Sequence, residues 1–358
     1  MEIHQILATA SPGDPVTDAA LDLRAVLRRI GPSEIFAHAV DGALEGDVGR
    51  LADYAARPEA GAGRDVLVYH ASTGEPAVCS FLLERRERLV LVAHPVPPAV
   101  HPVGVDPGAD ALPAHGLVER RALRQRVSLA LAVSEPTAAE LRSLGYGDVA
   151  IAPLPVDSGR LLALPSEPAT VAHIDEHLLG PLVLSVGPVL PYTRPDLLLS
   201  AYHVLVTYLV PDAYLAVVGP CPDAGYRGVL ESYRLQLNLH RAWFPGPAGA
   251  AGLAAWFRAA AVYVTACDHE DAHPAMLDAM AFDVPVVARA GGGAGRPAGA
   301  ALLLPPDDDP TLLAEALAEV LADDGTRRRL VDGGRRCRAE AAPERARAAF
   351  LAHLAGVV

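Results

Sequence analysis

Short apolar runs alternate with longer amphipathic stretches along the first half of the chain. A run of four to eight apolar or β-branched residues is typical of a buried strand, and apolar positions three or four residues apart are typical of a helix. Strands that alternate with helices indicate βαβ units and a mainly parallel sheet. The pattern predicts strands at 3–9, 34–39, 65–70, 88–94, 128–133 and 149–154, and helices at 16–29, 75–84, 112–126 and 137–144.

A proline-rich segment over 155–180 is expected to be a linker, after which the alternation begins again. Strands are predicted at 181–187, 213–219, 241–244, 262–265, 284–288 and 300–304, and helices at 195–210, 226–237, 310–322, 325–340 and 343–354. We therefore expect an α/β protein of two Rossmann-like, doubly wound domains, 1–165 and 166–340. A C-terminal helix within 341–358 is expected to return to the N-terminal domain. The carboxyl ends of the strands of two such domains face a central cleft.

Composition supports a globular protein and limits its partners. The chain is 51% hydrophobic and 20% charged, and its formal charge of -13 argues against nucleic acid or an anionic membrane as a general partner. All 30 basic residues are arginine, so lysine-dependent chemistry is excluded. The four cysteines are widely spaced, and the chain shows neither a signal peptide nor an apolar stretch long enough for a transmembrane helix. A cytoplasmic location is expected.

One pentapeptide has the pattern of a zinc site. His269-Glu270-Asp271-Ala272-His273 spells H-E-x-x-H, which on one continuous helix supplies two zinc ligands and a general base. However, the β-branched run over 261–265 predicts a strand just before it. Pro274 just after it disfavours a helical conformation at His273 and suits the first position of a new helix. The pentapeptide is therefore expected in a strand-to-helix loop.

Several stretches of the second half resemble family 4 of the retaining, nucleotide-sugar-dependent glycosyltransferases, which have the GT-B fold. The strongest is E-D-A-H-P-A-M-L-D-A-M-A-F-D-V-P-V-V-A over 270–288. Shorter similar stretches lie at 184–187, 196–199, 216–219, 244–246 and 305–313, and in the first half at 133–135 and 155–157. The resemblance implies a GT-B architecture with an N-terminal acceptor-side domain and a C-terminal domain for the nucleotide-sugar donor.

The signature of that family is E-x7-E, with one glutamate in the loop and another on the following helix. The resemblance implies that Glu270 contacts the donor sugar and that Asp278, one methylene shorter than the family's glutamate, holds the ribose hydroxyls. Pro274, Ala275 and Met276 would open a helix whose free N–H groups and positive dipole end face the donor diphosphate.

The chain departs from the family in the loop that binds phosphate. After the glycine that corresponds to Gly187, the family usually has an arginine and, a few residues later, a lysine. Pro188 and Thr193 stand at those places, and the adjacent Arg194 is the base expected to take part in donor binding. Charge that develops on a leaving phosphate normally needs such cations.

Further departures lie in the two loops of the signature region. Asp268, Glu270 and Asp271 form an acidic cluster, and His273 replaces a small residue and is expected to shape the sugar site. Gly292 belongs to a glycine-rich turn that in the family precedes an acidic residue, whereas here Arg296 follows as a candidate phosphate partner.

The N-terminal half offers candidates for the other side of the site. Gly13 follows the first strand, where the family brings backbone N–H groups towards donor and acceptor. His94 ends the fourth strand and is similar to the family histidine that meets the donor sugar, so we place it with Glu270 in the catalytic site. The segment 69–74, which includes His70, is expected on the acceptor side.

Three functions follow from these residues. The first is a glycosyltransferase that moves a sugar from a nucleotide-diphosphate donor to an unknown glycan, protein or small-molecule acceptor with retention of configuration. No cofactor or metal is expected, since the nucleotide sugar is the substrate. The second is a weakened or inactive homologue that acts as a binding or partner subunit, as the missing basic pair suggests. The third is a zinc hydrolase that uses His269 and His273, for which the sequence offers no third ligand at a recognisable spacing. Donor, acceptor and oligomeric state are left open.

Overall fold

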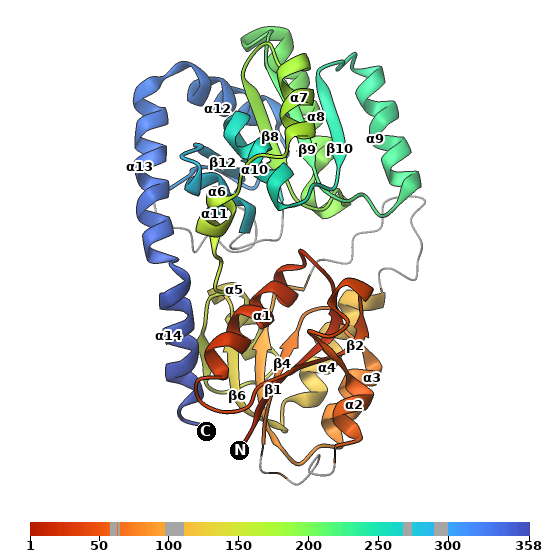
Figure 1. Cartoon of the computed structure of the whole chain (residues 1–358). Coiled ribbons are helices and arrows are strands. Elements are labelled where there is room, and N and C mark those ends of the chain that lie inside the picture. Colours follow the sequence, from red (N-terminus) through yellow and green to blue (C-terminus); the bar gives the residue numbers. More distant parts are fainter. Residues whose placement is uncertain (58–62, 64, 97–110, 268–273, 290–299) are drawn as a thin grey trace. The chain divides into compact units, whose positions relative to one another are not determined.

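The computed structural model describes residues 1–57, 63, 65–96, 111–267, 274–289 and 300–358, and these form two compact units (Figure 1). The first unit runs to Val156 and takes up Ala341–Val358 at the C-terminus. The second unit spans Asp157–Glu340.

The described part of the first unit contains a seven-stranded parallel sheet. Its strand order is β3-β2-β1-β4-β5-β6-β7, so the chain builds outward from β1 in one direction and then outward from β4 in the other. The strands are β1 (Ile3–Ala10), β2 (Ile35–Val40), β3 (Gly49–Arg50), β4 (Val66–Ala71), β5 (Arg88–Ala93), β6 (Val127–Ala132) and β7 (Val149–Ile151).

Alternation along these strands divides their side chains between two cores. Val66 and Val68 of β4 pack in one core with Leu23 and Leu27 of α1, whereas Leu67 packs on the opposite face. That second core holds side chains from α2, α3 and α5. The helices of this unit are α1 (Pro15–Leu27), α2 (Leu51–Ala55), α3 (Pro76–Leu83), α4 (Ala111–Leu123), α5 (Glu135–Ser143) and α14 (Pro343–Leu354), with a 3-10 turn at Gly42–Leu44.

The C-terminal helix belongs to the first unit. Phe350 and Leu354 of α14 are buried in the same core as Ile3 and the α1 leucines, and Figure 1 shows α14 running alongside the elements of this unit. Arg347 also forms an ion pair with Asp22 of α1. The last helix therefore covers part of a sheet that begins more than three hundred residues earlier in the chain.

The second unit is also doubly wound. In its described part, six parallel strands have the order β10-β9-β8-β11-β12-β13, and the direction of winding reverses between β8 and β11. The strands are β8 (Leu182–Val186), β9 (Tyr214–Val218), β10 (Ala242–Gly246), β11 (Ala260–Thr265), β12 (Val286–Arg289) and β13 (Leu302–Leu304). Two doubly wound parallel sheets confirm the predicted α/β class.

Helices flank this second sheet. Val183, Val262 and Val264 pack in one core with leucines of α8 and α12. The helices are α6 (Ser158–Ala163), α7 (Pro168–His177), α8 (Pro195–Val204), α9 (Ala224–Gln236), α10 (Ala250–Ala259), α11 (Pro274–Ala281), α12 (Pro310–Ala322) and α13 (Asp324–Glu340), with a 3-10 turn at Pro191–Thr193 and a π-helix at Leu205–Leu209.

The elements differ from the predicted ones mainly where proline was interpreted as a breaker. The segment 155–180 was predicted to be a linker but contains α6 and α7. Pro168 stands in the first turn of α7, where its missing N–H costs nothing, and Asp157 caps α6 by accepting a hydrogen bond from the Arg160 N–H. α11 begins at Pro274 as expected, whereas α10 had no predicted counterpart.

Candidate functional site

The strand order places the best candidate site of the second unit at the carboxyl ends of β8 and β11. In an open, doubly wound sheet the loops separate at the point where the winding reverses, and ligands bind in the crevice that this leaves. Residues that follow β8 and β11, Gly187, Pro188, Thr193 and Cys267, line a narrow cavity there. The sequence-predicted Gly187 and Arg194 lie in the loop between β8 and α8.

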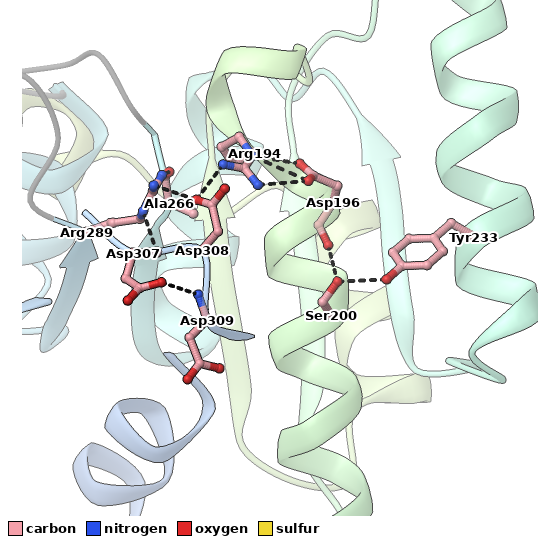
Figure 2. Close-up of polar contacts among 9 residues, drawn as sticks. All are labelled: Arg194, Asp196, Ser200, Tyr233, Ala266, Arg289, Asp307, Asp308 and Asp309. Carbon is pink, nitrogen blue, oxygen red and sulfur yellow. Dashed lines mark hydrogen bonds and ion pairs between the residues drawn. The ribbon is translucent and has the colours of Figure 1, made fainter. Parts of the chain in front are cut away.

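Two arginines meet one carboxylate at this edge of the sheet (Figure 2). Arg194 Nη1 donates to Asp308 Oδ1 over 2.8 Å, and Arg289 Nη2 donates to the same oxygen over 2.6 Å. Arg289 ends β12, and Asp308 lies between β13 and α12. Since both nitrogens contact one oxygen, the two guanidinium groups form a single seat that the Asp308 carboxylate occupies.

Both arginines are also held by neighbours other than Asp308. Arg194 Nε and Nη2 donate to the Asp196 carboxylate over 3.2 and 3.1 Å. Arg289 Nε donates to the Asp307 carbonyl over 2.9 Å, and its Nη1 to the Ala266 carbonyl over 3.4 Å. The Arg289 side chain is 9% exposed, whereas that of Asp308 is 60% exposed. The arginines are therefore held by several neighbours, and the carboxylate between them is the most exposed of the three groups.

The charges in this seat stabilise one another. Burial lowers the pKa of Arg194, but its bonds to Asp196 and Asp308 outweigh burial and raise that pKa above its ordinary value. The bond from Arg194 holds the pKa of Asp308 below its ordinary value, and Arg289 lowers it further. Arg194 and Asp308 therefore both remain charged near pH 7. Arg194 itself has a left-handed backbone with φ of 54°, which is uncommon for a residue other than glycine.

The loop after β8 is closed on itself where the family has its basic pair. The Thr193 hydroxyl donates to the carbonyl groups of Pro188 and Leu190 over 2.9 and 2.8 Å. Gly187 lies so close to the start of the next loop that a Cβ on Gly219 would stand 1.8 Å from the Gly187 carbonyl oxygen. At the start of the loop after β8, backbone groups and the Thr193 hydroxyl, rather than basic side chains, therefore line the carboxyl edge of the second sheet.

The helix that follows β11 begins where the sequence places it. Pro274, Ala275 and Met276 form the first turn of α11, and Ala275 and Met276 are buried. Asp278 lies in the next turn and is half-buried. Glu270, His273 and Gly292, together with His269 and Arg296, lie outside the described residues. The predicted roles of all these residues stay predictions.

The corresponding edge of the first unit lies at the carboxyl ends of β1 and β4, where its winding reverses. Gly13 stands in the turn after β1 with φ of 76°, a conformation that favours glycine. Asp14 then caps α1, since its carboxylate accepts hydrogen bonds from the Thr17 N–H and the Thr17 hydroxyl, each over 2.8 Å. The turn places the first turn of α1 at this edge.

His94 is buried and belongs to a chain of polar side chains beneath the same edge. Its Nε2 lies 3.1 Å from His70 Nδ1, and His70 Nε2 lies 2.9 Å from Gln5 Oε1. Burial lowers the pKa of His70 to about 4. Burial, with the charges of His70 and Arg120, holds the pKa of His94 well below its ordinary value. Both rings are therefore neutral near pH 7.

A buried arginine fixes the backbone around His94. Arg120 of α4 is fully buried, and its Nη2 donates to the Ala71 carbonyl over 2.9 Å and to the His94 carbonyl over 2.5 Å. The His94 N–H in turn donates to the Ala71 carbonyl over 2.8 Å. Arg120 also pairs with Glu140 of α5. These bonds join the carboxyl ends of β4 and β5 and hold His94 in one position.

Four residues of the arginine seat and of the polar chain around His94 were not predicted from the sequence: Arg289, Asp308, Gln5 and Arg120. A signal was present for two of them. Gln5 interrupts the apolar face of β1, and Arg289 ends an apolar strand at the edge where ligands bind. A polar residue at a buried position needs a partner, so each could have been questioned from the strand pattern alone.

One group of possible metal ligands occurs in the described part of the chain, away from both edges. Ligand atoms of Glu2, His4 and Asp65 lie within 4.8 Å of one another near the amino ends of β1 and β4. Arg57 contacts both Glu2 and His4. The Arg57 guanidinium can only donate, and its Nη1 lies 2.6 Å from His4 Nε2, so a cation already stands against these ligand atoms.

Within the described residues, no helix combines the length and the apolar character that crossing a membrane requires.

Known proteins resemble this chain in sequence over one unit and in fold over nearly its whole length. Residues 180–323 match the family described as glycosyl transferases group 1. No curated protein sequence matches.

Solved structures with a similar fold include HepE of Anabaena in complex with UDP, at 17% identity and a TM-score of 0.75 over 99% of this chain and 100% of that one. Sucrose-phosphate synthase from Thermosynechococcus elongatus gives 19% identity and a TM-score of 0.75 over 99% and 98%. The α,α-trehalose 6-phosphate synthase of Burkholderia multivorans gives 14% and 0.71 over 99% and 98%. We therefore assign the chain the GT-B fold, and its second unit the sequence pattern of the group 1 glycosyltransferases.

Proposed function

We propose that this protein is a glycosyltransferase that moves a sugar from a nucleotide-diphosphate donor to an acceptor hydroxyl. The observation that carries the proposal is the seat formed by Arg194 and Arg289 at the carboxyl edge of the unit that matches the group 1 glycosyltransferases. Guanidinium groups suit phosphate because their N–H donors match its oxygens in pairs. In this proposal a donor phosphate takes the place of the Asp308 carboxylate between the two arginines.

The proposed reaction retains the configuration of the transferred sugar. The bond between the anomeric carbon and the donor phosphate oxygen breaks, and a bond to the acceptor oxygen forms on the same face. The acceptor proton passes to the leaving phosphate. Such a reaction needs no protein nucleophile, and the protein contributes positioning and charge stabilisation. Arg194 and Arg289 would stabilise the charge on the leaving diphosphate, so we propose no cofactor.

The remaining predicted residues complete the proposed site. Glu270 and His94 would contact the donor sugar, Asp278 the ribose, and the first turn of α11 the diphosphate. The turn at Gly13 would offer backbone N–H groups to the donor and to the acceptor, whose class is open. We also propose a cytoplasmic location, in keeping with the four cysteines, which are all free thiols.

A second candidate is a homologue that binds a nucleotide or a partner without transferring sugar. Two observations favour it. Asp196 and Asp308 already neutralise both arginines, and Pro188 occupies the place of the family's arginine. The two functions differ in turnover, and only the transferase requires the nucleotide sugar to bind.

Nucleotide binding and turnover can be measured on three matched variants. Uridine, guanosine and adenosine diphosphates, and their glucose forms, are titrated while the melting temperature and hydrolysis of the sugar nucleotide are followed. Arg289→Gln should weaken diphosphate binding by about tenfold to a hundredfold, because a charged hydrogen bond contributes about 1.5–3 kcal/mol. Asp308→Asn should strengthen diphosphate binding, because a competing carboxylate charge is removed.

Arg241→Gln is the control for these variants. Arg241 lies before β10, at the amino edge of the same sheet, and donates to the Pro211 carbonyl. It should leave nucleotide affinity unchanged. If Arg289→Gln and Asp308→Asn weaken nucleotide binding equally, the ion pairs among Arg194, Arg289 and Asp308 only stabilise the fold, and the donor site lies elsewhere. Binding without hydrolysis or transfer by the wild type would favour the inactive homologue.

A further inference from the structure

Three polar side chains share one face of the first sheet, where apolar ones are the rule. Gln5 follows Ile3 by two positions, His70 follows Val68, and His94 follows Val92, so alternation directs each to the face covered by α1. Gln5 is completely buried, and the two histidines are 1% and 2% exposed. Polar groups this deeply buried persist only if their hydrogen bonds are satisfied, which constrains where each proton can lie.

The first constraint comes from the Gln5 amide. Its Nε2 donates to the Ala20 carbonyl of α1 over 2.8 Å. A carbonyl can only accept, so the amide NH₂ group must face Ala20 and the amide oxygen must face His70. The orientation of Gln5 is thus set by the backbone of α1.

The second constraint passes from Gln5 to His70. The Gln5 oxygen accepts, so His70 Nε2, at 2.9 Å, must carry a proton. The ring is neutral, because burial lowers its pKa to about 4. A neutral imidazole has one proton, and His70 Nδ1 therefore presents a lone pair to His94.

The third step fixes His94. Its Nε2 lies 3.1 Å from the His70 lone pair and must be the donor in that bond. We infer that Gln5 and His70 are positioning residues that fix the tautomer of His94, so that its Nδ1 is a hydrogen-bond acceptor towards a ligand. Within the described residues, His94 Nδ1 has no hydrogen-bond partner. The bonds from Arg120 and to Ala71 hold the backbone of His94 in place.

The fixed tautomer selects the chemistry of the ligand group that faces His94. A hydroxyl or an N–H group can donate to Nδ1, whereas an ionised carboxylate or phosphate cannot. A donor sugar therefore meets His94 through a hydroxyl group, and His94 acts as a neutral acceptor rather than as a general acid. This consequence for the sugar rests on the proposed glycosyltransferase function. The assignment of the tautomer does not.

The tautomers can be read directly from the free protein. Long-range ¹H–¹⁵N correlation spectra of ¹⁵N-histidine-labelled protein near pH 7 distinguish a protonated ring nitrogen from one with a lone pair. His70 and His94 should both carry the proton on Nε2. A proton on Nδ1 of His94 in the wild type would overturn the inference, and this measurement requires no variant and no ligand.

Gln5→Glu tests the direction of the relay. The introduced carboxyl group, when ionised, stabilises a protonated His70, whose Nδ1 then donates to His94. His94 Nε2 must then accept, and the His94 proton should move to Nδ1. Gln5→Met, which removes both bonds at similar volume, should leave both rings as mixtures of tautomers. It keeps the test valid if the glutamate variant does not fold, or if the new carboxyl group keeps a proton and donates it to the Ala20 carbonyl. An unchanged ¹⁵N pattern in folded Gln5→Met would contradict the relay.

UDP-glucose serves as the probe for the ligand half of the inference. Gln5→Glu should weaken its binding by about tenfold, the value of one buried hydrogen bond, because His94 then offers a donor in place of an acceptor. Ser33→Ala is the control, since Ser33 is a buried polar residue of the same unit that lies outside the relay. A moved proton with unchanged affinity would refute the acceptor role of His94. If no nucleotide sugar binds the wild type while the tautomers are as assigned, the proposed function fails and the relay stands.

Discussion

At the scale of single residues, buried ionisable groups of the first unit make its stability depend on pH in two opposite ways. Burial raises the pKa of Glu119 on α4 from 4.5 to about 7, and the Tyr69 hydroxyl donates to its carboxyl group over 3.3 Å. Burial lowers the pKa of His70 to about 4. The folded state is favoured when the Glu119 carboxyl group is protonated, and it is favoured when the His70 ring is neutral.

Glu119→Gln should therefore change the pH profile in a definite direction. In the unfolded chain Glu119 ionises near pH 4.5, whereas in the folded protein it keeps its proton up to about pH 7. The free energy of unfolding then falls as pH rises between these values, and the loss is complete above pH 7. It amounts to at most about 3 kcal/mol. The glutamine variant should lack this loss and gain stability relative to the wild type at pH about 8.

Urea denaturation at pH about 5 and about 8, followed by far-UV circular dichroism, checks this prediction. Glu84→Gln changes an exposed carboxyl group at the end of α3 and should keep the slope of the wild type. Equal pH slopes in the wild type and in Glu119→Gln would mean that the buried carboxyl group is already ionised below pH 7.

Single residues also show why part of the candidate site could not be predicted from the sequence. Arg194 was recognised as a candidate because it is close in sequence to the loop that resembles the family. Its counterpart Arg289 ends β12 and the shared Asp308 lies in the loop after β13, and only the parallel pairing of β8, β11, β12 and β13 brings the three residues together. A cluster built from three distant segments has no spacing that a motif could record.

At the scale of elements, the loops after β8 and β9 approach one another so closely that glycine is required at Gly219. Gly187 and Gly219 follow β8 and β9, and Gly246 ends β10. The Gly187 N–H donates to the Val218 carbonyl, and the Gly219 N–H donates to the Gly246 carbonyl. The φ angle of Gly219 is 159°, and a Cβ there would overlap the Gly187 carbonyl oxygen at 1.8 Å. This contact is between backbone atoms, so no side-chain rotation relieves it.

Gly219→Ala should therefore destabilise the second unit by several kcal/mol, about 3 or more, since overlap and strain add. Gly228→Ala on the exposed face of α9 is the matched control. A Cβ at Gly228 meets nothing within 4 Å, and alanine there should stabilise the helix by about 0.5–1 kcal/mol. Urea midpoints followed by tryptophan fluorescence compare the two, because Trp243 and Trp256 both belong to this unit. Similar midpoints for the two variants would show that the loop after β8 can shift away from a Cβ at position 219 at little cost in stability.

Elements were predictable where local chemistry and the fold agree. The apolar runs of the central strands and the proline at the start of α11 gave correct predictions. α6 and α7 were missed because proline and polar residues at a helix start look like a linker when the sequence is considered alone. The short β3 was missed because two residues, Gly49 and Arg50, carry no periodic pattern and pair only because β2 offers an open edge.

At the scale of the whole molecule, the first unit is completed by the end of the chain. Phe350 of α14 is 2% exposed and packs against β1, β4 and β5 residues in the core shared with α1. The fold class could be predicted from alternation, but no local pattern in α14 identifies the sheet it covers. That depends on a hydrophobic face left open between elements hundreds of residues away.

Phe350→Ala should destabilise the first unit selectively. Removing a buried phenylalanine costs about 3–5 kcal/mol, because apolar burial is lost and a cavity remains. Hydrogen exchange of β1 and β4 amides should report this loss, whereas tryptophan fluorescence, which reports the second unit, should keep its urea midpoint. Arg345→Ala, at an exposed position of the same helix, should change neither signal by more than about 0.5 kcal/mol. A shift of the fluorescence midpoint as large as the loss in the first unit would mean that the two units unfold together, and stability differences in either one would then affect the whole chain.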